Sequence, residues 1–215
     1  MDKNEVKISL GELRSRDHGR AMQFAIEGMH LHWYIGNKFL LNLYARYFWY
    51  LELTRATQVI AAYADGLFAG ILLAELKGEK HKHASFWKSL YVKLFDVLQR
   101  LFAGQTVSVY DKANKEMLAH FTRQANPDGE IIFLAADPES KIKGVGSTML
   151  AELEKRNRGK RIYLYTDSAC TYQFYERRGF ERVGEKDIAL TLSDKTIDLT
   201  CLLYSKVLGQ STSAS

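Results

Sequence analysis

The sequence predicts an α/β protein with a mixed, mostly antiparallel sheet flanked by helices. Three features of the chain predict this class. An apolar run at 131–136 is followed by a glycine-bearing turn and a helical pattern. Two strand-like segments, 58–64 and 67–76, are joined by Asp65-Gly66, which is a strong hairpin signal. Segments 180–188 and 197–206 then have the pattern of a final antiparallel pair.

The composition fits one domain. The 215 residues are enough for a single core, so we expect one domain over 1–208 and a disordered polar tail at 209–215. Hydrophobic residues make up 47% and charged residues 26%, which is ordinary for a globular protein. No apolar run reaches the roughly 18 residues that a membrane span requires. The first residues lack the apolar core of a signal peptide, so we expect a cytoplasmic protein.

The cysteines and histidines do not predict a metal or a disulfide framework. Cys170 and Cys201 are too few for such a framework and lack zinc-type spacing. His30 and His32 are too close in sequence for helical metal ligation, and no partner cluster accompanies them. The sequence therefore predicts no metal site and a reduced chain. Within it, Cys170 is interpreted as a small buried residue rather than a reactive thiol.

The first part of the chain predicts a strand and two helices before the hairpin. Residues 5–13 alternate as a strand does, and Ser15-Arg16-Asp17 offers a helix cap. Apolar residues at helical spacing then continue to Met29. A second helical stretch at 37–53 is dense in aromatic residues, some of which must belong to the core.

About fifty residues, 77–129, separate the hairpin from the central strand. Apolar residues from Phe86 to Phe102 recur at helical intervals and predict one long amphipathic helix, interrupted near Gly104. A second helix is expected from about Lys112 to Gln124, before a turn at 126–129.

The positive charge of the chain is concentrated in this segment. The net charge is +5, and six basic against two acidic residues between Lys77 and Arg100 leave a local balance of 6 − 2 = +4. Such a segment could attract an acidic substrate, nucleic acid or cofactor phosphates. A solvated helix face is the simpler interpretation. The basic residues are Lys77, Lys80, Lys82, Lys88, Lys93 and Arg100.

The segment after the central strand has the composition of an anion site. Gly144 and Gly146 lie where the helical pattern begins, after Asp137-Pro138 has ended the apolar run. The N-terminus of a helix has unpaired N–H groups and a positive dipole end, which together bind phosphate. Glycine lets the backbone approach an anion closely. The spacing matches neither the phosphate loop of nucleotide hydrolases nor the dinucleotide fingerprint.

Two motifs resemble those of the GNAT acetyltransferases. Lys141 to Gly146 resembles the family's pyrophosphate loop, Arg/Gln-x-x-Gly-x-Gly/Ala, with Lys141 in the first place. Residues 166–180 resemble its closing motif, a polar residue, a short helix and then Tyr-x-x-x-Gly-Phe, which ends here at Gly179-Phe180. The motifs cover about 130–187, and the hairpin fits the family's second and third strands. The resemblance implies a GNAT-type twisted sheet in which 77–129 is a helical insertion between the third and fourth strands.

The resemblance also implies acetyl-CoA as cosubstrate of an N-acetyltransferase (EC 2.3.1.-). Backbone N–H groups of the glycine turn would hold the pyrophosphate, and the edge of the central strand would pair with the pantetheine amides. Lys141 supplies a cation but lacks the fork geometry of arginine. Ser168 stands where the family often has Asn, with Asp167 as the adjacent substitute. The implied cofactor-binding residues are Leu134, Ala135, Ala136, Lys141, Ile142, Lys143, Gly144, Val145, Gly146, Ser147, Asp167, Ser168, Thr171, Tyr172 and Phe174.

Tyr175 is the expected catalytic residue. At the family's Tyr-x-x-x-Gly-Phe position it would protonate the leaving thiolate of CoA, and a phenol with a pKa of about 10 suits that step. Tyr172, three residues earlier, could serve instead. The base that deprotonates the amine is not identified. Candidates are a water chain or one of Glu27, His30, His32 and Glu130.

Several alternatives remain open at this point. The acceptor is a primary amine of a small molecule, peptide or protein, and Ala135 and Ala136 are small enough to admit a longer acyl group. A non-catalytic CoA- or nucleic-acid-binding regulatory protein on the same fold is the second hypothesis, although nucleic acid is not the expected partner. The helical insertion could form a lid over the acceptor cleft or a homodimer contact, and we favour the lid.

Overall fold

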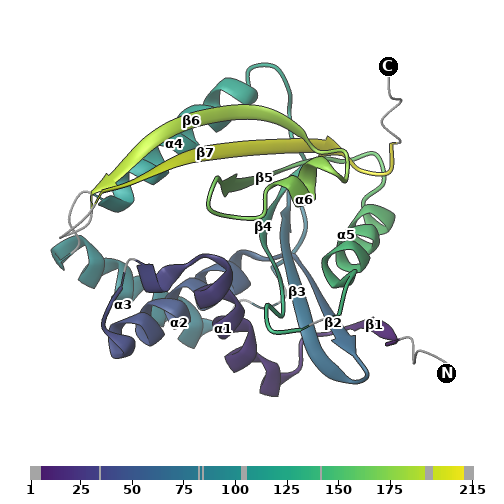
Figure 1. The fold of residues 1–215 in the computed structure, drawn as a ribbon, viewed down its shortest axis with the longest axis horizontal. Coiled ribbons are helices and arrows are strands. Elements are labelled where there is room, and N and C mark those ends of the chain that lie inside the picture. Colours follow the sequence, from purple (N-terminus) through teal and green to yellow (C-terminus); the bar gives the residue numbers. More distant parts are fainter. Residues whose placement is uncertain are drawn as a thin grey trace. The chain divides into compact units, whose positions relative to one another are not determined.

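A computed structural model describes residues 6–33, 35–81, 83, 85–102, 106–140, 142–191 and 196–210, without the side chains of 96–102, 106–108 and 191. In this described part, seven strands form an open sheet in the order β1-β2-β3-β4-β5-β7-β6 (Figure 1). The sheet is mixed, mostly antiparallel and flanked by helices, which confirms the predicted fold class. The chain divides into two compact units, 1–92 with 132–156 and 93–131 with 157–215. The single domain over 1–208 stays a prediction.

The first unit contains a three-stranded antiparallel sheet, the end of β4 and the helices around them. The Asp65-Gly66 turn joins β2 and β3 as predicted, and both residues have positive φ (48° and 81°). A two-residue turn of this kind matches the twist of the two strands. The elements are β1 (Ile8–Gly11), η1 (Ser15–Asp17), α1 (His18–Gly28), η2 (Leu31–Trp33), α2 (Lys38–Arg55), β2 (Gln58–Ala64), β3 (Leu67–Leu76), the start of α3 (Phe86–Phe102), the end of β4 (Gly129–Ala136) and α5 (Val145–Arg156).

The core of the first unit lies between its sheet and the helices α1 and α2. Trp49 and Leu53 of α2 pack in one cluster with side chains of β2 and β3, including Tyr63 and Ile71. Gly70 faces the helix α5 instead, where an added Cβ would lie 2.7 Å from Val145 Cγ1. Successive strand residues point to opposite faces, so α5 covers the face that α1 and α2 leave.

The two helix starts differ in how their N-terminal groups are satisfied. Asn37 caps α2, because its side-chain oxygen accepts hydrogen bonds from the N–H groups of Phe39 and Leu40. The helix cap expected within Ser15-Arg16-Asp17 is wrong, because no side chain caps η1 or α1. Asp17 makes no capping bond, since its carboxylate accepts the hydroxyl of Tyr63 at 2.9 Å instead. The first strand is also shorter than 5–13.

The second unit completes the sheet with parallel and antiparallel pairs. The start of β4 runs parallel to β5, with Gly129 beside Ile162. β5 is antiparallel to β7, and β7 to β6, as expected for the final strand pair. The elements are the rest of α3, α4 (Thr106–Phe121), the start of β4, β5 (Arg161–Asp167), α6 (Gln173–Glu176), β6 (Glu181–Thr191) and β7 (Thr196–Val207).

The helix α4 packs against β6 and β7. Its buried residues Ala113, Met117 and Phe121 share one face. Gly184 of β6 lets this face of α4 pack closely on the strand, because a Cβ at Gly184 would lie 3.1 Å from Met117 Cβ. The predicted bounds of this helix are wrong, since it starts six residues before Lys112 and ends three before Gln124.

Two sequence predictions fall on undescribed residues. The interruption near Gly104 lies outside the described residues, as do the last five residues of the tail. None of the helices in the described part combines the length and hydropathy that crossing a bilayer requires.

Candidate active site

In the first unit, β4 ends in a turn that is tied to two other elements. Leu134, Ala135 and Ala136 form the end of the strand, and the N–H of Asp137 bonds to the carbonyl of Ala69 at 2.8 Å. Arg20 of α1 places Nη2 within 3.0–3.1 Å of both Asp137 oxygens and 3.1 Å from Glu139. These bonds raise the pKa of Arg20. The guanidinium therefore fixes the turn and offsets two negative charges just ahead of α5.

The glycine turn leads directly into α5. Gly144 has φ of +91°, which a side chain rarely tolerates. The first intrahelical bond runs from Thr148 N–H to the Gly144 carbonyl at 2.9 Å. The first N–H groups of a helix point toward its N-terminal end, so the start of α5 has the form of a phosphate site. Ile142 donates its N–H to Ser140 Oγ at 3.2 Å, Lys143 is exposed, and Lys141 lies outside the described residues.

In the second unit, Asp167 ends β5 and orders the turn that follows. Its Oδ1 accepts the N–H groups of Ala169 (2.9 Å) and Cys170 (3.2 Å), and its Oδ2 accepts the hydroxyl of Tyr110 at 3.1 Å. Ser168 exchanges two 3.0 Å bonds with Thr200, through N–H to carbonyl and N–H to Oγ. The turn is thus fixed to α4 on one side and β7 on the other.

Tyr175 lies on the short helix α6 inside an aromatic cluster. Its ring centroid is 5.2 Å from that of Phe174, 5.8 Å from that of Phe180 and 6.3 Å from that of Tyr204. The Phe180 N–H bonds to the Tyr175 carbonyl at 3.1 Å, across Gly179 with φ of +73°. Burial raises the pKa of Tyr175 above its ordinary value near 10. The phenol therefore keeps its proton at neutral pH and can serve as a proton donor.

The other predicted residues of this motif have separate contacts. Tyr172 precedes α6 and accepts the Tyr175 N–H through its carbonyl at 2.9 Å. Its ring lies 5.6 Å from the guanidinium carbon of Arg182. Phe174 lies 3.7 Å from the guanidinium carbon of Arg178, and Thr171 is exposed. The structure thus brings Phe174 against Tyr175 and holds Tyr172 one turn away.

Both cysteines are free thiols, and Cys170 is half-buried rather than buried as predicted, whereas Cys201 is buried. Burial raises the pKa of Cys170 to about 12 and that of Cys201 to about 11. Both thiols stay protonated at neutral pH, which supports a packing role for Cys170 over a reactive one.

None of the four side chains proposed as a base is singled out by the geometry. Glu27 accepts Gln23 Nε2 at 2.6 Å, and Glu130 accepts the Tyr163 hydroxyl at 3.1 Å. His30, at φ of +51°, stacks on Trp33 with ring centroids 4.3 Å apart, and His32 meets the same ring edge-on. Among the described residues, no three His, Cys, Asp or Glu side chains gather as a metal site requires.

Sequence reasoning missed His18. Its Nδ1 accepts the indole N–H of Trp49 at 2.9 Å, which leaves the proton of the neutral ring on Nε2. Burial lowers the pKa of His18. The imidazole is therefore neutral and joins α1 to α2. No motif signals this pair, because its members are 31 residues apart.

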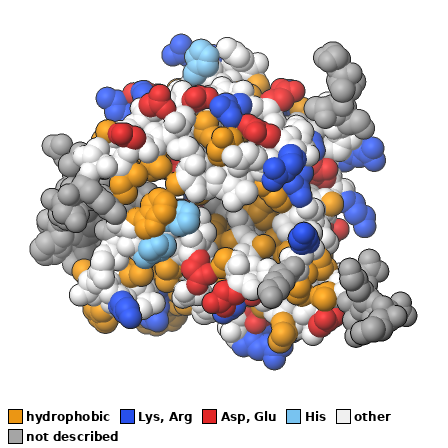
Figure 2. All heavy atoms as spheres, viewed as in Figure 1, with side chains coloured by type: hydrophobic (Ala, Val, Ile, Leu, Met, Phe, Trp, Pro, Cys, Tyr) orange, Lys and Arg blue, Asp and Glu red, His pale blue; other side chains and the backbone are white. Residues whose placement is uncertain are grey.

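The surface carries mixed charge. On the face shown in Figure 2, basic side chains are interspersed with acidic ones. Lys77, Lys80 and Lys93 are exposed, whereas Lys88 is half-buried and burial lowers its pKa. Lys82 lies outside the described residues. The described lysines of residues 77–100 thus differ in exposure and do not all lie on the surface.

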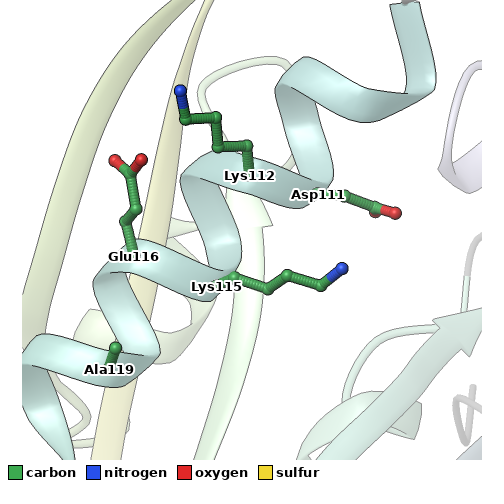
Figure 3. Close-up of a pocket in the computed structure, with 5 residues that line it drawn as sticks. All are labelled: Asp111, Lys112, Lys115, Glu116 and Ala119. Carbon is green, nitrogen blue, oxygen red and sulfur yellow. The ribbon is translucent and has the colours of Figure 1, made fainter.

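An open hollow lies along the outer side of α4 (Figure 3). Lys112 and Glu116 point to one side of the helix, and Asp111 and Lys115 to another. Glu116 forms an ion pair with Lys186 of β6. Because all the residues that line the hollow belong to this one helix, the hollow resembles a solvated helix face, and we assign it no binding role. The lining residues are Asp111, Lys112, Lys115, Glu116 and Ala119.

The fold and the start of α5 together indicate the class of protein. It is an α/β protein in which the central strand β4 is followed by a glycine turn and by a helix N-terminus suited to binding an anion. Within that class, the model of the Acetyltransferase (GNAT) family matches residues 29–180. The chain belongs to the GNAT acetyltransferases, which use acetyl-CoA as cosubstrate. No curated protein sequence matches the chain significantly.

Solved structures share the fold at low sequence identity. The PaiA N-acetyltransferase of Thermoplasma acidophilum in complex with coenzyme A is 16% identical with a TM-score of 0.50, over 94% of this chain and 99% of that one. A protein of Corynebacterium glutamicum described as histone acetyltransferase HPA2 and related acetyltransferase is 16% identical with a TM-score of 0.53, over 95% of this chain and 98% of that one. The polyamine N-acetyltransferase of Drosophila melanogaster is 12% identical with a TM-score of 0.54, over 94% of this chain and 100% of that one.

Proposed function

We propose that the protein transfers the acetyl group of acetyl-CoA directly to a primary amine of a small molecule, peptide or protein. Family membership carries the reaction class. The observation that supports the site is the start of α5, where Gly144 at φ +91° leads the chain into the helix and its carbonyl accepts the N–H of Thr148. Such a helix end suits the pyrophosphate of CoA.

The remaining predicted residues have assigned parts in this proposal. The end of β4, Leu134 to Ala136, pairs with the pantetheine amides, and Lys141 and Lys143 add positive charge near the phosphates. Asp167, Ser168, Thr171, Tyr172 and Phe174 form the wall along the pantetheine arm. The side chains of Asp167 and Ser168 already accept hydrogen bonds in their own unit, so their part is to shape this wall.

Tyr175 is the proposed general acid. When the neutral amine attacks the thioester carbon, a C–N bond forms and the C–S bond breaks. The electron pair of that bond leaves with sulfur, and the phenol donates its proton to the thiolate. Burial supports this role, because it keeps the phenol protonated. The proton released by the amine goes to water or to an unidentified base.

The test combines an amine panel with a tyrosine pair. Purified protein is mixed with acetyl-CoA and single amines, and release of thiol is followed. We expect release with at least one amine, and Tyr175→Phe to lower kcat by about tenfold or more with circular dichroism unchanged. Tyr172→Phe is the matched control and should change kcat by less than about threefold.

The possible outcomes separate the claims. Full activity in Tyr175→Phe removes Tyr175 from the mechanism, and a large loss in Tyr172→Phe alone moves the role to Tyr172. An absence of thiol release with every amine contradicts acetyl transfer to amines. The same panel with longer acyl-CoA thioesters tests whether acetyl is the preferred group.

A further inference from the structure

The helix α4 sends one polar side chain into the turn that precedes α6. The Tyr110 hydroxyl donates to Asp167 Oδ2 at 3.1 Å. Ala113, Met117 and Phe121 of the same helix are apolar and buried. A hydroxyl in such a place is costly unless it is hydrogen-bonded, so this bond accounts for a tyrosine rather than a phenylalanine at position 110.

The second oxygen of the same carboxylate orders the turn itself. Asp167 Oδ1 accepts the N–H groups of Ala169 and Cys170, the second and third residues after it. Cys170 then accepts the Tyr172 N–H through its carbonyl at 2.9 Å, and the Tyr172 carbonyl accepts the Tyr175 N–H at 2.9 Å. A continuous series of hydrogen bonds therefore runs from Tyr110 through Asp167 to the backbone of Tyr175.

The chemistry of Tyr110 and Asp167 fits a fixed hydrogen-bonded link between α4 and the turn, which we call the clasp. Burial and the charge of Asp167 raise the pKa of Tyr110, so its hydroxyl stays a donor at any working pH. Each carboxylate oxygen has its own partner, α4 on one side and the turn on the other. Without the tyrosine hydroxyl, the carboxylate would be held by the turn alone and could rotate with it.

We propose that Tyr110 is a positioning residue for acetyl transfer, holding Asp167 and thereby the turn from which α6 presents Tyr175. This role rests on the proposed function, in which Tyr175 is the acid. It gives α4 a structural part in the reaction that neither a lid nor a dimer contact describes.

Three variants test the clasp, and all are measured for kcat, CoA affinity and melting temperature. Tyr110→Phe removes only the hydroxyl and should lower kcat by about 10- to 100-fold, because small displacements of a reacting group have effects of this size. The Kd for CoA should change by a smaller factor than kcat, because the proposed pyrophosphate site lies at α5 and not on this turn. Asp167→Ala should match this loss, whereas Asp167→Asn, which retains an acceptor oxygen, should recover much of it.

The matched control is Tyr63→Phe in the first unit. Tyr63 also donates a buried hydrogen bond to an aspartate, Asp17, at 2.9 Å. The Tyr63→Phe substitution should lower the melting temperature as Tyr110→Phe does, but its kcat should stay within about twofold of the wild-type value. The double variant Tyr110→Phe/Asp167→Ala should be no slower than Asp167→Ala, since the two act as one unit.

Amide hydrogen exchange supplies a readout that does not require turnover. In Tyr110→Phe, exchange at Ala169, Cys170 and Tyr175 should be faster than in the wild type, whereas exchange in β2 should not change. Unchanged exchange at these amides, or a kcat of Tyr110→Phe within twofold of the wild type, overturns the inference. A wild type that releases no thiol with any amine contradicts the proposed function instead, and the exchange data still decide whether Tyr110 orders the turn.

Discussion

At the scale of single residues, the proposed mechanism depends on how burial sets the protonation of Tyr175. Three aromatic rings lie within 6.3 Å of the ring centroid of this half-buried residue, and burial raises the pKa of its phenol. A raised pKa on an acid means that the protonated form persists to a higher pH. The proposed proton donor is therefore protonated over the whole neutral and mildly alkaline range.

This protonation state predicts the pH dependence of the reaction. The kcat/KM should rise with pH as the amine acceptor loses its proton, and then stay level to at least about pH 10, where an ordinary tyrosine would be half ionised. Initial rates of thiol release between pH 6 and 10 measure the profile. A fall in kcat/KM with an apparent pKa near 8 or 9 would show that another group supplies the proton.

Sequence reasoning at this scale found the motif residues but not their partners. Tyr175 and the two glycines of the phosphate turn could be named because a short motif carries them. The bonds Tyr110–Asp167, Arg20–Asp137 and His18–Trp49 join residues 57, 117 and 31 positions apart. Tertiary folding alone brings such pairs together, so no local pattern reveals them.

At the scale of elements, the close packing of α5 on β3 positions the glycine turn that we propose binds phosphate. A Cβ at Gly70 would meet Val145 Cγ1 at 2.7 Å, Met149 Cε at 2.9 Å and the Ala135 carbonyl at 3.0 Å. The residues that it would meet belong to β4 and to the first turns of α5. Glycine at this position therefore lets the helix that begins at the anion site lie directly on the strand.

A substitution at Gly70 tests this packing. Gly70→Ala should destabilise the protein by about 1–3 kcal/mol, because the backbone carbonyl of Ala135 cannot move as a side chain can. Gly19→Ala in α1 is the control, since nothing lies within 4 Å of its Cβ position, and it should be neutral or stabilising by up to about 1 kcal/mol. Urea unfolding gives both values. Equal stability of the two variants would mean that α5 and β3 are not in close contact.

Elements with strong local signals were predicted well. The Asp65-Gly66 hairpin has the predicted bounds, and α2 begins beside its cap at Asn37. The start of α4 was missed because Thr106, Val107 and Val109 are β-branched and disfavour a helix locally. A cap was predicted within Ser15-Arg16-Asp17, but the carboxylate of Asp17 accepts the Tyr63 hydroxyl in the folded chain.

At the scale of the whole molecule, the phenols and thiols whose pKa is raised most lie in the second unit. Burial raises the pKa of Tyr204 to about 12, that of Cys170 to about 12 and that of Cys201 to about 11, and it raises those of Tyr110 and Tyr175 as well. In the unfolded chain these groups ionise near 8.5 for cysteine and 10 for tyrosine. The folded chain therefore keeps protons that the unfolded chain loses.

Stability should consequently fall in alkali. The contribution of these groups is fully present below pH 8.5 and is lost as pH rises through the folded values near 11 and 12, because the unfolded state binds fewer protons in that window. The free energy of unfolding in urea should decrease steadily between about pH 9 and 11. A constant or rising free energy over this interval would contradict the burial of these thiols and phenols.

The central claim is that the start of α5 binds the pyrophosphate of CoA, and calorimetric titration with CoA tests it most directly. We predict binding with measurable heat, competition by acetyl-CoA, and affinity about tenfold weaker or worse in Ser147→Asp, whose carboxylate repels the anion while favouring the helix. Ala151→Asp, on the exposed side of the same helix, adds equal charge and should bind CoA as the wild type does. A titration without heat or competition, or equal weakening in both variants, would contradict the account.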